Sequence, residues 1–132
     1  MAALTGQLNQ LTSVELLRNA ARTANINSST LTTTDYIGAI RVQVNSGNIT
    51  AGDNNSTYTF SLQDSTVDTA ANYANISNTY TLTACSNVAT IATVDIPVRE
   101  LKQYFRVVGN IAGGNSPSFP VGVTVIGLKQ VG

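Results

Sequence analysis

The chain divides near residue 35 into two regions that differ in their pattern of apolar and polar positions. In the first region, Leu4, Leu8 and Leu11 recur at helical spacing. Ser13 is a suitable cap for a short helix from Val14 to about Thr23. We therefore expect residues 1–34 to form a short N-terminal helix, or an arm that orders on a partner, followed by a polar linker. Residues 35–132 are then the folded body.

Beyond residue 35, apolar and polar residues alternate with a period of two, which is typical of strands with one buried face. The strands that this pattern predicts are 36–44, 58–63, 79–84, 88–95, 103–112 and 119–129, with 48–50 as a further short candidate. The segment 119–129 is apolar on both faces, which indicates a central position in a sheet. Between the strands we expect a long surface loop at 64–77, a single helical turn beginning at Pro97 and a hairpin-like connection at 113–117.

Six or seven short strands with little helix cannot bury their apolar faces in a single sheet. Two packed antiparallel sheets solve this problem. We therefore predict an all-β chain folded as an antiparallel β-sandwich, of either the jelly-roll or the immunoglobulin-like type.

The composition supports one folded domain and argues against several classes of partner. The 132 residues include 42% hydrophobic but only 11% charged residues, and seven Lys and Arg balance seven Asp and Glu. This neutrality argues against nucleic-acid binding and against attachment to a membrane surface. No apolar run is long enough to span a membrane, and the first residues do not resemble a signal peptide. The single cysteine, Cys85, excludes an internal disulfide and suits assembly in a reducing cytoplasm.

The sequence offers little for catalysis or metal binding. Without His, neither a Ser-His-Asp triad nor an imidazole metal site can form. Asp64 and Asp68 lie in a polar loop that does not suit a catalytic carboxylate pair, so we interpret them as turn-forming residues. The pattern Asp53, Asn55, Thr57 presents oxygens at alternate positions but lacks the closing Glu of a calcium loop. We expect no enzymatic activity and no cofactor.

Two further groups of residues have competing interpretations. Tyrosines in a binding face could stack on sugars, but tyrosines in strands more often border a core or an interface. The residues concerned are Tyr58, Tyr73, Tyr80 and Tyr104. Cys85 has no cationic neighbour in the sequence to lower the pKa of its thiol, so we interpret it as a small buried packing residue and not as a nucleophile.

The strand sequences themselves resemble those of one family. The segment VQVNSGNIT at 42–50 is followed by YTFSLQDS at 58–65, and YFRVVG at 104–109 is followed by SPSFPV at 116–121. This order is similar to that of small virion proteins of tailed bacteriophages that are encoded near the capsid gene. The resemblance covers about residues 36–129. Asp64 stands where the family has Glu, and the N-terminal region lies outside the resemblance.

The resemblance implies a capsid decoration (cement) protein, located on the exterior of the virion and assembled in the host cytoplasm. Its expected partners are the major capsid protein and further copies of the chain, in a symmetric homo-oligomer such as a trimer. We predict that Leu4, Leu8 and Leu11 contribute to the partner contact, while packing of these leucines on the chain's own core is the alternative. A tail or spike accessory protein and a carbohydrate-binding adhesin module are the alternative functions.

Overall fold

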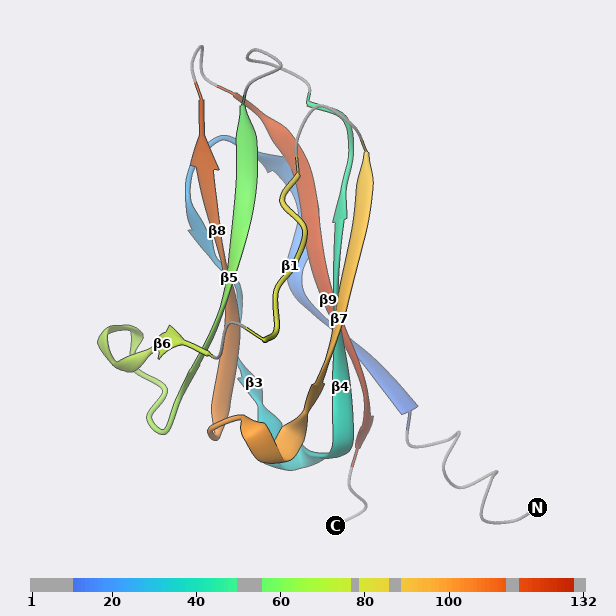
Figure 1. Cartoon of the computed structure of the whole chain (residues 1–132), viewed down its shortest axis with the longest axis vertical. Helices are drawn as coiled ribbons and strands as arrows, with labels where there is room; N and C mark the ends of the chain where they lie inside the picture. The colour runs from blue at the N-terminus through green and yellow to red at the C-terminus, as the bar shows by residue number, and fades with distance from the viewer. Residues whose placement is uncertain (1–10, 50–55, 77–78, 86–88, 114–116, 130–132) are drawn as a thin grey trace, which may run out of the picture.

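The computed structural model describes residues 11–49, 56–76, 79–85, 89–113 and 117–129, and these form two antiparallel sheets packed against each other (Figure 1). Sheet A contains, in spatial order, β1 (Leu11–Arg22), β9 (Phe119–Lys129), β4 (Tyr36–Ser46) and β7 (Thr90–Pro97). Sheet B contains β2 (Ile26–Asn27), β8 (Tyr104–Ala112), β5 (Thr57–Ser65) and β6 (Ala74–Asn75), and β3 (Leu31–Thr32) also pairs with β8. Three single turns of 3-10 helix are η1 (Thr33–Asp35), η2 (Ala70–Asn72) and η3 (Val98–Glu100). The predicted all-β sandwich is confirmed.

The strand pairs are nested along the chain. The strand β1 pairs with β9, β2 and β3 pair with β8, β4 pairs with β7, and β5 pairs with β6, all antiparallel. Each pair lies inside the previous one in sequence, as in one long hairpin. When this hairpin folds over on itself, β4 comes beside β9 and β5 comes beside β8. This is the order of a jelly roll, and it differs from the immunoglobulin order.

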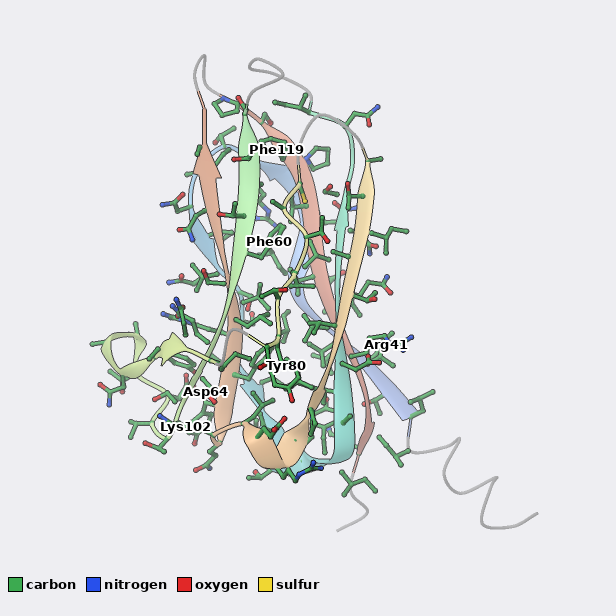
Figure 2. The ribbon with its side chains drawn as sticks, viewed as in Figure 1. Arg41, Phe60, Asp64, Tyr80, Lys102 and Phe119 are labelled. Atoms are coloured by element: carbon green, nitrogen blue, oxygen red, sulfur yellow. The ribbon has the colours of Figure 1, made fainter. Side chains whose placement is uncertain are left out.

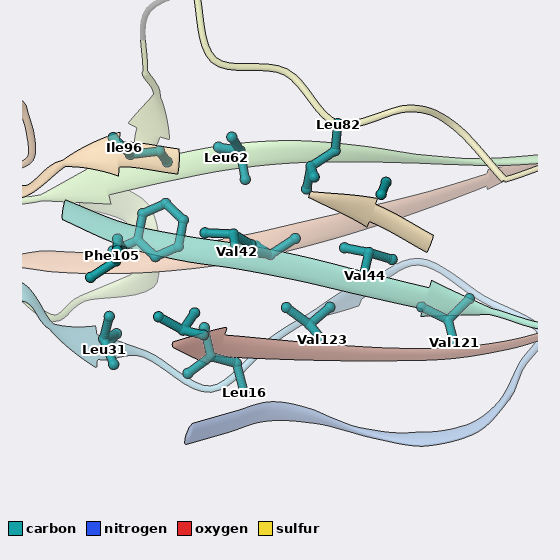
Figure 3. Close-up of a cluster of buried hydrophobic side chains, with 14 of the residues drawn as sticks. Leu16, Leu31, Val42, Val44, Leu62, Leu82, Ile96, Phe105, Val121 and Val123 are labelled. Carbon is teal, nitrogen blue, oxygen red and sulfur yellow. The ribbon is translucent and has the colours of Figure 1, made fainter. Parts of the chain in front are cut away.

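The core lies between the two sheets, because alternate side chains of each strand point inward. It includes buried side chains from both sheets, several of which are labelled in Figure 3: Tyr36, Ile40, Val42, Val44, Tyr58, Leu62, Ile96, Phe105, Val107, Phe119, Val121, Val123 and Val125. Tyr58 meets Phe119 edge to face, with ring centroids 5.8 Å apart, and its hydroxyl donates to the Ala24 carbonyl over 2.9 Å. A buried tyrosine thus keeps its hydrogen bond, as burial of a hydroxyl requires.

The helix predicted from Val14 to Thr23 is wrong, because this segment belongs to β1. Two register shifts, between Glu15 and Leu17 and between Leu17 and Ala20, break the alternation of β1. An irregular strand of this kind loses the period of two that would have identified it in the sequence. Pairing with β1 also satisfies the backbone groups on one side of β9. The described part of the region expected as helix or arm and linker, residues 11–34, supplies β1, β2 and β3 to the two sheets.

The predicted strands 36–44, 58–63, 88–95, 103–112 and 119–129 correspond to β4, β5, β7, β8 and β9. Asn48 and Ile49, the described residues of the short candidate 48–50, are not in a strand, and the expected surface loop at 64–77 contains η2 and β6. The segment 79–84 is not a strand, and only Cys85 beside it forms an isolated bridge, with Tyr58. The expected hairpin-like connection at 113–117 instead joins strands of different sheets, since β8 lies in sheet B and β9 in sheet A. The central position of β9 is confirmed, and η3 is the helical turn expected after Pro97.

Candidate interaction surface

The outer face of sheet A carries a row of exposed apolar side chains at one end. Leu11 on β1 lies opposite Leu128 on β9, and Leu128 in turn lies opposite Ile37 on β4. Leu11 is 54% exposed and Ile37 is 42% exposed. Leu11 is the only one of the three predicted partner-binding leucines within the described residues, because Leu4 and Leu8 lie outside them.

A shallow depression extends this row toward β7. Ile126 lies opposite both Ser13 and Arg41, so it occupies the next row across the sheet. The depression is lined by parts of all four strands: Leu11, Ala39, Ile40, Arg41, Asp95, Ile126, Gly127 and Leu128. We call the set Leu11, Ile37, Ala39, Ile126 and Leu128 the apolar end of sheet A.

One ion pair borders the apolar end. The Arg41 Nε donates to Asp95 Oδ1 over 2.7 Å, and Arg41 Nη2 donates to Asp95 Oδ2 over 3.0 Å. The hydrogen bond from Arg41 lowers the pKa of the Asp95 carboxyl. Arg41 points away from the core on the outer side of sheet A (Figure 2). Because the two charges neutralise each other, this border adds no net charge to the face.

The remaining outward positions of sheet A are mainly uncharged. Glu15, Thr124, Gln43 and Thr93 form one row across the four strands. In the row beyond it, Asn45 lies opposite Ile91. Protein–protein contacts are depleted in charged residues at their centre, and this face has the same character.

A loop of the chain itself covers part of the outer face of sheet B. The guanidinium of Arg106 on β8 lies 4.3 Å from the ring centroid of Tyr73, and its Nε donates to Gln63 Oε1 over 3.0 Å. The Tyr73 hydroxyl donates to Asp68 Oδ1 over 2.9 Å. Burial, followed by this hydrogen bond to Asp68, raises the pKa of Tyr73 to about 12. These contacts hold the 66–75 segment against sheet B.

The two carboxyl groups singled out in the sequence have different partners. Asp64 is buried and accepts a hydrogen bond from the backbone N–H of Lys102 over 3.0 Å; both residues are labelled in Figure 2. Asp68 is exposed and bonds to Tyr73 and to the Thr30 hydroxyl. Asp64 therefore anchors a distant loop instead of forming its own turn.

The calcium pattern falls largely outside the described residues. Asp53 and Asn55 lie outside them, and Thr57 is the first residue of β5. Within the described ranges, no group of three or more His, Cys, Asp or Glu side chains could hold a metal ion.

The four tyrosines considered for sugar stacking are engaged with other parts of the chain. Tyr58 is in the core and Tyr73 lies under Arg106. The Tyr80 hydroxyl donates to the Glu100 carboxylate, and the Tyr104 hydroxyl accepts from Gln103 Nε2. Because each of the four tyrosines contacts a different part of the chain, their rings do not form one surface on which a sugar could stack.

The interpretation of Cys85 as a buried packing residue is confirmed. Its side chain belongs to the core, and its backbone N–H and carbonyl both bond to Tyr58 over 2.9 Å. Burial raises the pKa of the Cys85 thiol, which disfavours the reactive thiolate.

The sequence analysis did not single out Ile37, Ile126 and Leu128. The available signal was the second apolar face of 119–129, but the residues that this face meets depend on the register with β1 and β4.

No family model matches the chain, and no curated protein matches it. None of the helical turns in the described ranges is long and apolar enough to cross a membrane.

Proposed function

We propose that this chain is a structural virion protein that binds the exterior of a tailed-phage capsid and stabilises it as a decoration protein. The observation that carries the proposal is the apolar end of sheet A, where Leu11 and Ile37 are exposed on a rigid sheet. The motif resemblance of residues 36–129 adds support. The jelly-roll order is compatible, because viral capsid domains use this architecture.

The apolar end offers a binding energy that suits attachment to a lattice. Burying a whole Leu or Ile side chain stabilises a contact by about 1.5–3 kcal/mol, and these side chains are already half covered. The apolar end alone is therefore too small for a tight single contact, which typically covers about 800 Å² per partner. Residues 1–10, with Leu4 and Leu8, join the body at Leu11 and would enlarge the contact. Several linked copies on a lattice would gain further through avidity.

The carbohydrate-binding alternative has less support, although lectins also use jelly rolls. Sugar recognition would require accessible aromatic rings, whereas the Tyr58 side chain is buried in the core and the Tyr73 ring lies against the Arg106 guanidinium. A tail or spike protein would use the same surface on another part of the virion.

Where a gene beside the one for this chain encodes a major capsid protein, binding to shells assembled from that protein tests the proposal. We expect the full chain to co-sediment with the shells saturably, and electron microscopy to show its density on the head exterior. Density on the tail would support the accessory-protein alternative, and no binding at saturating shell concentration would refute the proposal.

Paired variants test the surface itself. Ile37→Asp places a charge in the apolar end, and we expect it to weaken shell binding at least tenfold. Val67→Asp is the matched control, because Val67 is 48% exposed but lies in the loop that follows β5 of sheet B. Equal binding by the two variants would exclude the apolar end from the contact. Removal of residues 1–10 separately tests the contribution of Leu4 and Leu8.

A further inference from the structure

Among the sheet edges formed by the described residues, only the β7 edge is both long and regular. The opposite edge of sheet A, β1, contains two register shifts. The edges of sheet B consist of strands of two residues each, β2 and β3 on one side and β6 on the other. The eight residues of β7 pair with β4 without any shift. Proteins commonly protect their edge strands from pairing with other chains by bulges, short length, charges or proline, whereas β7 has no bulge and carries a charge and a proline only at Asp95 and Pro97, near its end.

The backbone groups of β7 that face away from β4 can be identified from the register. The Gly47 N–H donates to the Pro120 carbonyl over 2.9 Å, at the position that continues the β4–β9 pairing. In an antiparallel sheet, alternate residues bond to opposite neighbours, so odd-numbered residues of β4 between 41 and 45 bond to β9 and even-numbered ones bond to β7. The even-numbered residues of β7 are their partners. The N–H and C=O groups of Ile91, Thr93 and Asp95 consequently point outward from the edge.

The position of Pro97 agrees with this assignment. Pro97 belongs to the same outward-facing set, so its missing N–H removes no hydrogen bond to β4. Ile91, another member of the set, is 72% exposed, more than any other large apolar residue in the described ranges.

The side chains of β7 are complementary to those of a second, antiparallel β7 in one register. With a two-fold axis at Val94, Ile91 of one copy lies opposite Pro97 of the other, and Thr93 lies opposite Asp95. The Thr93 hydroxyl can then donate to the carboxylate, and Val94 meets its own equivalent. A two-fold axis at Thr93 would instead place Ile91 opposite the charged Asp95.

We propose that β7 pairs with β7 of a second copy about a two-fold axis at Val94, which joins two copies of sheet A into one eight-stranded sheet. This inference goes beyond the proposed function and does not depend on it. In such a dimer the outer faces of sheet A of the two copies lie on the same side of the joined sheet. A dimer would present two apolar ends to one lattice.

The expected dimer is weak. An eight-residue strand is about 27 Å long, and its edge covers roughly 400 Å² per copy, about half of a standard interface. We therefore expect a monomer–dimer equilibrium that depends on concentration.

Sedimentation of the full chain over a range of concentrations tests the pairing. Thr93→Pro removes an outward N–H, and we expect it to weaken the dimer at least tenfold while leaving the β4 pairing intact. Thr93→Ser keeps both the N–H and the hydroxyl and is the matched control, with thermal unfolding of both variants as the check on folding. A monomer at all concentrations, a trimer, or a dimer insensitive to Thr93→Pro would overturn the proposal.

Disulfide trapping tests the register. Val94 faces its equivalent in a pair without mutual hydrogen bonds, where Cα atoms lie about 4.5 Å apart, which is within the range that a disulfide spans. Val94→Cys should therefore form a covalent dimer under mild oxidation, while Thr93→Cys should not, and the buried Cys85 should not interfere. Trapping through Thr93→Cys alone would overturn the register. Capsid binding is measured separately on the Thr93→Pro variant. Binding by this monomer would show that capsid attachment does not require the dimer, so that the two proposals can fail independently.

Discussion

The outer faces of sheet A and sheet B are both formed by every second side chain of their strands, but they differ in what contacts them. On sheet B, Arg106 stacks on Tyr73 and bonds to Gln63, so that the 66–75 segment lies against the sheet. On sheet A, Leu11 and Ile37 are exposed beside a self-neutralising ion pair. Polar outward side chains of sheet B thus find partners within the chain. The apolar ones of sheet A remain available to another molecule, as contiguous exposed apolar residues often do.

The largest effect should follow from removing β1, which forms one edge of sheet A. Deletion of residues 1–22 uncovers one side of β9 and removes the buried Leu16. We expect loss of cooperative unfolding, because the missing contacts approach the whole stability of a small domain, about 5–15 kcal/mol. Circular dichroism during thermal unfolding measures this. Deletion of residues 1–10 is the control and should preserve the transition.

On the sheet B side of the core, Gly109→Ala should destabilise the fold by about 2–3 kcal/mol through overpacking. A Cβ at Gly109 would lie 2.2 Å from Cε1 of the buried Tyr58. On sheet A, Gly38 has open space but a φ of +74°, so Gly38→Ala should cost only about 1 kcal/mol, and Gly38→Asn less. Urea denaturation compares the three variants. A cost for Gly109→Ala no larger than that for Gly38→Ala would contradict the close packing at Tyr58.

Removing the charge of Arg106 should loosen the cover of sheet B. Arg106→Met keeps most of the side-chain length but loses the hydrogen bond and the cation–π contact, each worth about 0.5–1.5 kcal/mol. We expect faster hydrogen exchange in 66–75 together with this loss of stability. Arg41→Met removes a charge from the exposed ion pair of sheet A and should have a smaller effect. Equal effects would remove the distinction between the two faces.

The cover of sheet B should also weaken in strong alkali. The pKa of Tyr73 is raised to about 12 in the folded chain, above its ordinary value near 10. A raised folded pKa means that this stabilisation is complete below about pH 10 and is lost as the pH rises through about 12. A nuclear magnetic resonance titration of the Tyr73 ring measures the pKa directly. Asp68→Asn should lower it, because the neighbouring carboxylate disfavours the phenolate, and an unchanged pKa would exclude that contribution.

The smallest effect on stability is expected for Ile37→Thr on the outer face of sheet A. The side chain is 42% exposed and lies on the outer face, away from the core, so the free energy of unfolding should change by less than about 0.5 kcal/mol. Shell binding should nevertheless fall. A loss of several kcal/mol in stability would show that Ile37 serves the fold and not a partner.

The strands that could be predicted from the sequence are those whose pattern of apolar residues is regular over neighbouring positions. The strands β4 and β5 were predictable because their apolar and polar residues alternate, and β8 and β9 because their segments carry the apolar runs that are typical of buried strands. The strand β1 was not, because its register shifts disturb the alternation. In the candidate surface, Leu11 was singled out from the sequence because of its helical spacing from Leu4 and Leu8, although it lies in a strand. Its neighbours Ile37 and Leu128 were not singled out.

An all-β sandwich without net charge could be predicted from the residues alone, because strand periodicity and charge are properties of short stretches of chain. The jelly-roll order, and the meeting of Leu11, Leu128 and Ile37 on one face, became visible only in the folded molecule. The physical reason is that register is set by pairing between segments far apart in the chain. No short stretch of sequence contains the partner against which its side chains will lie.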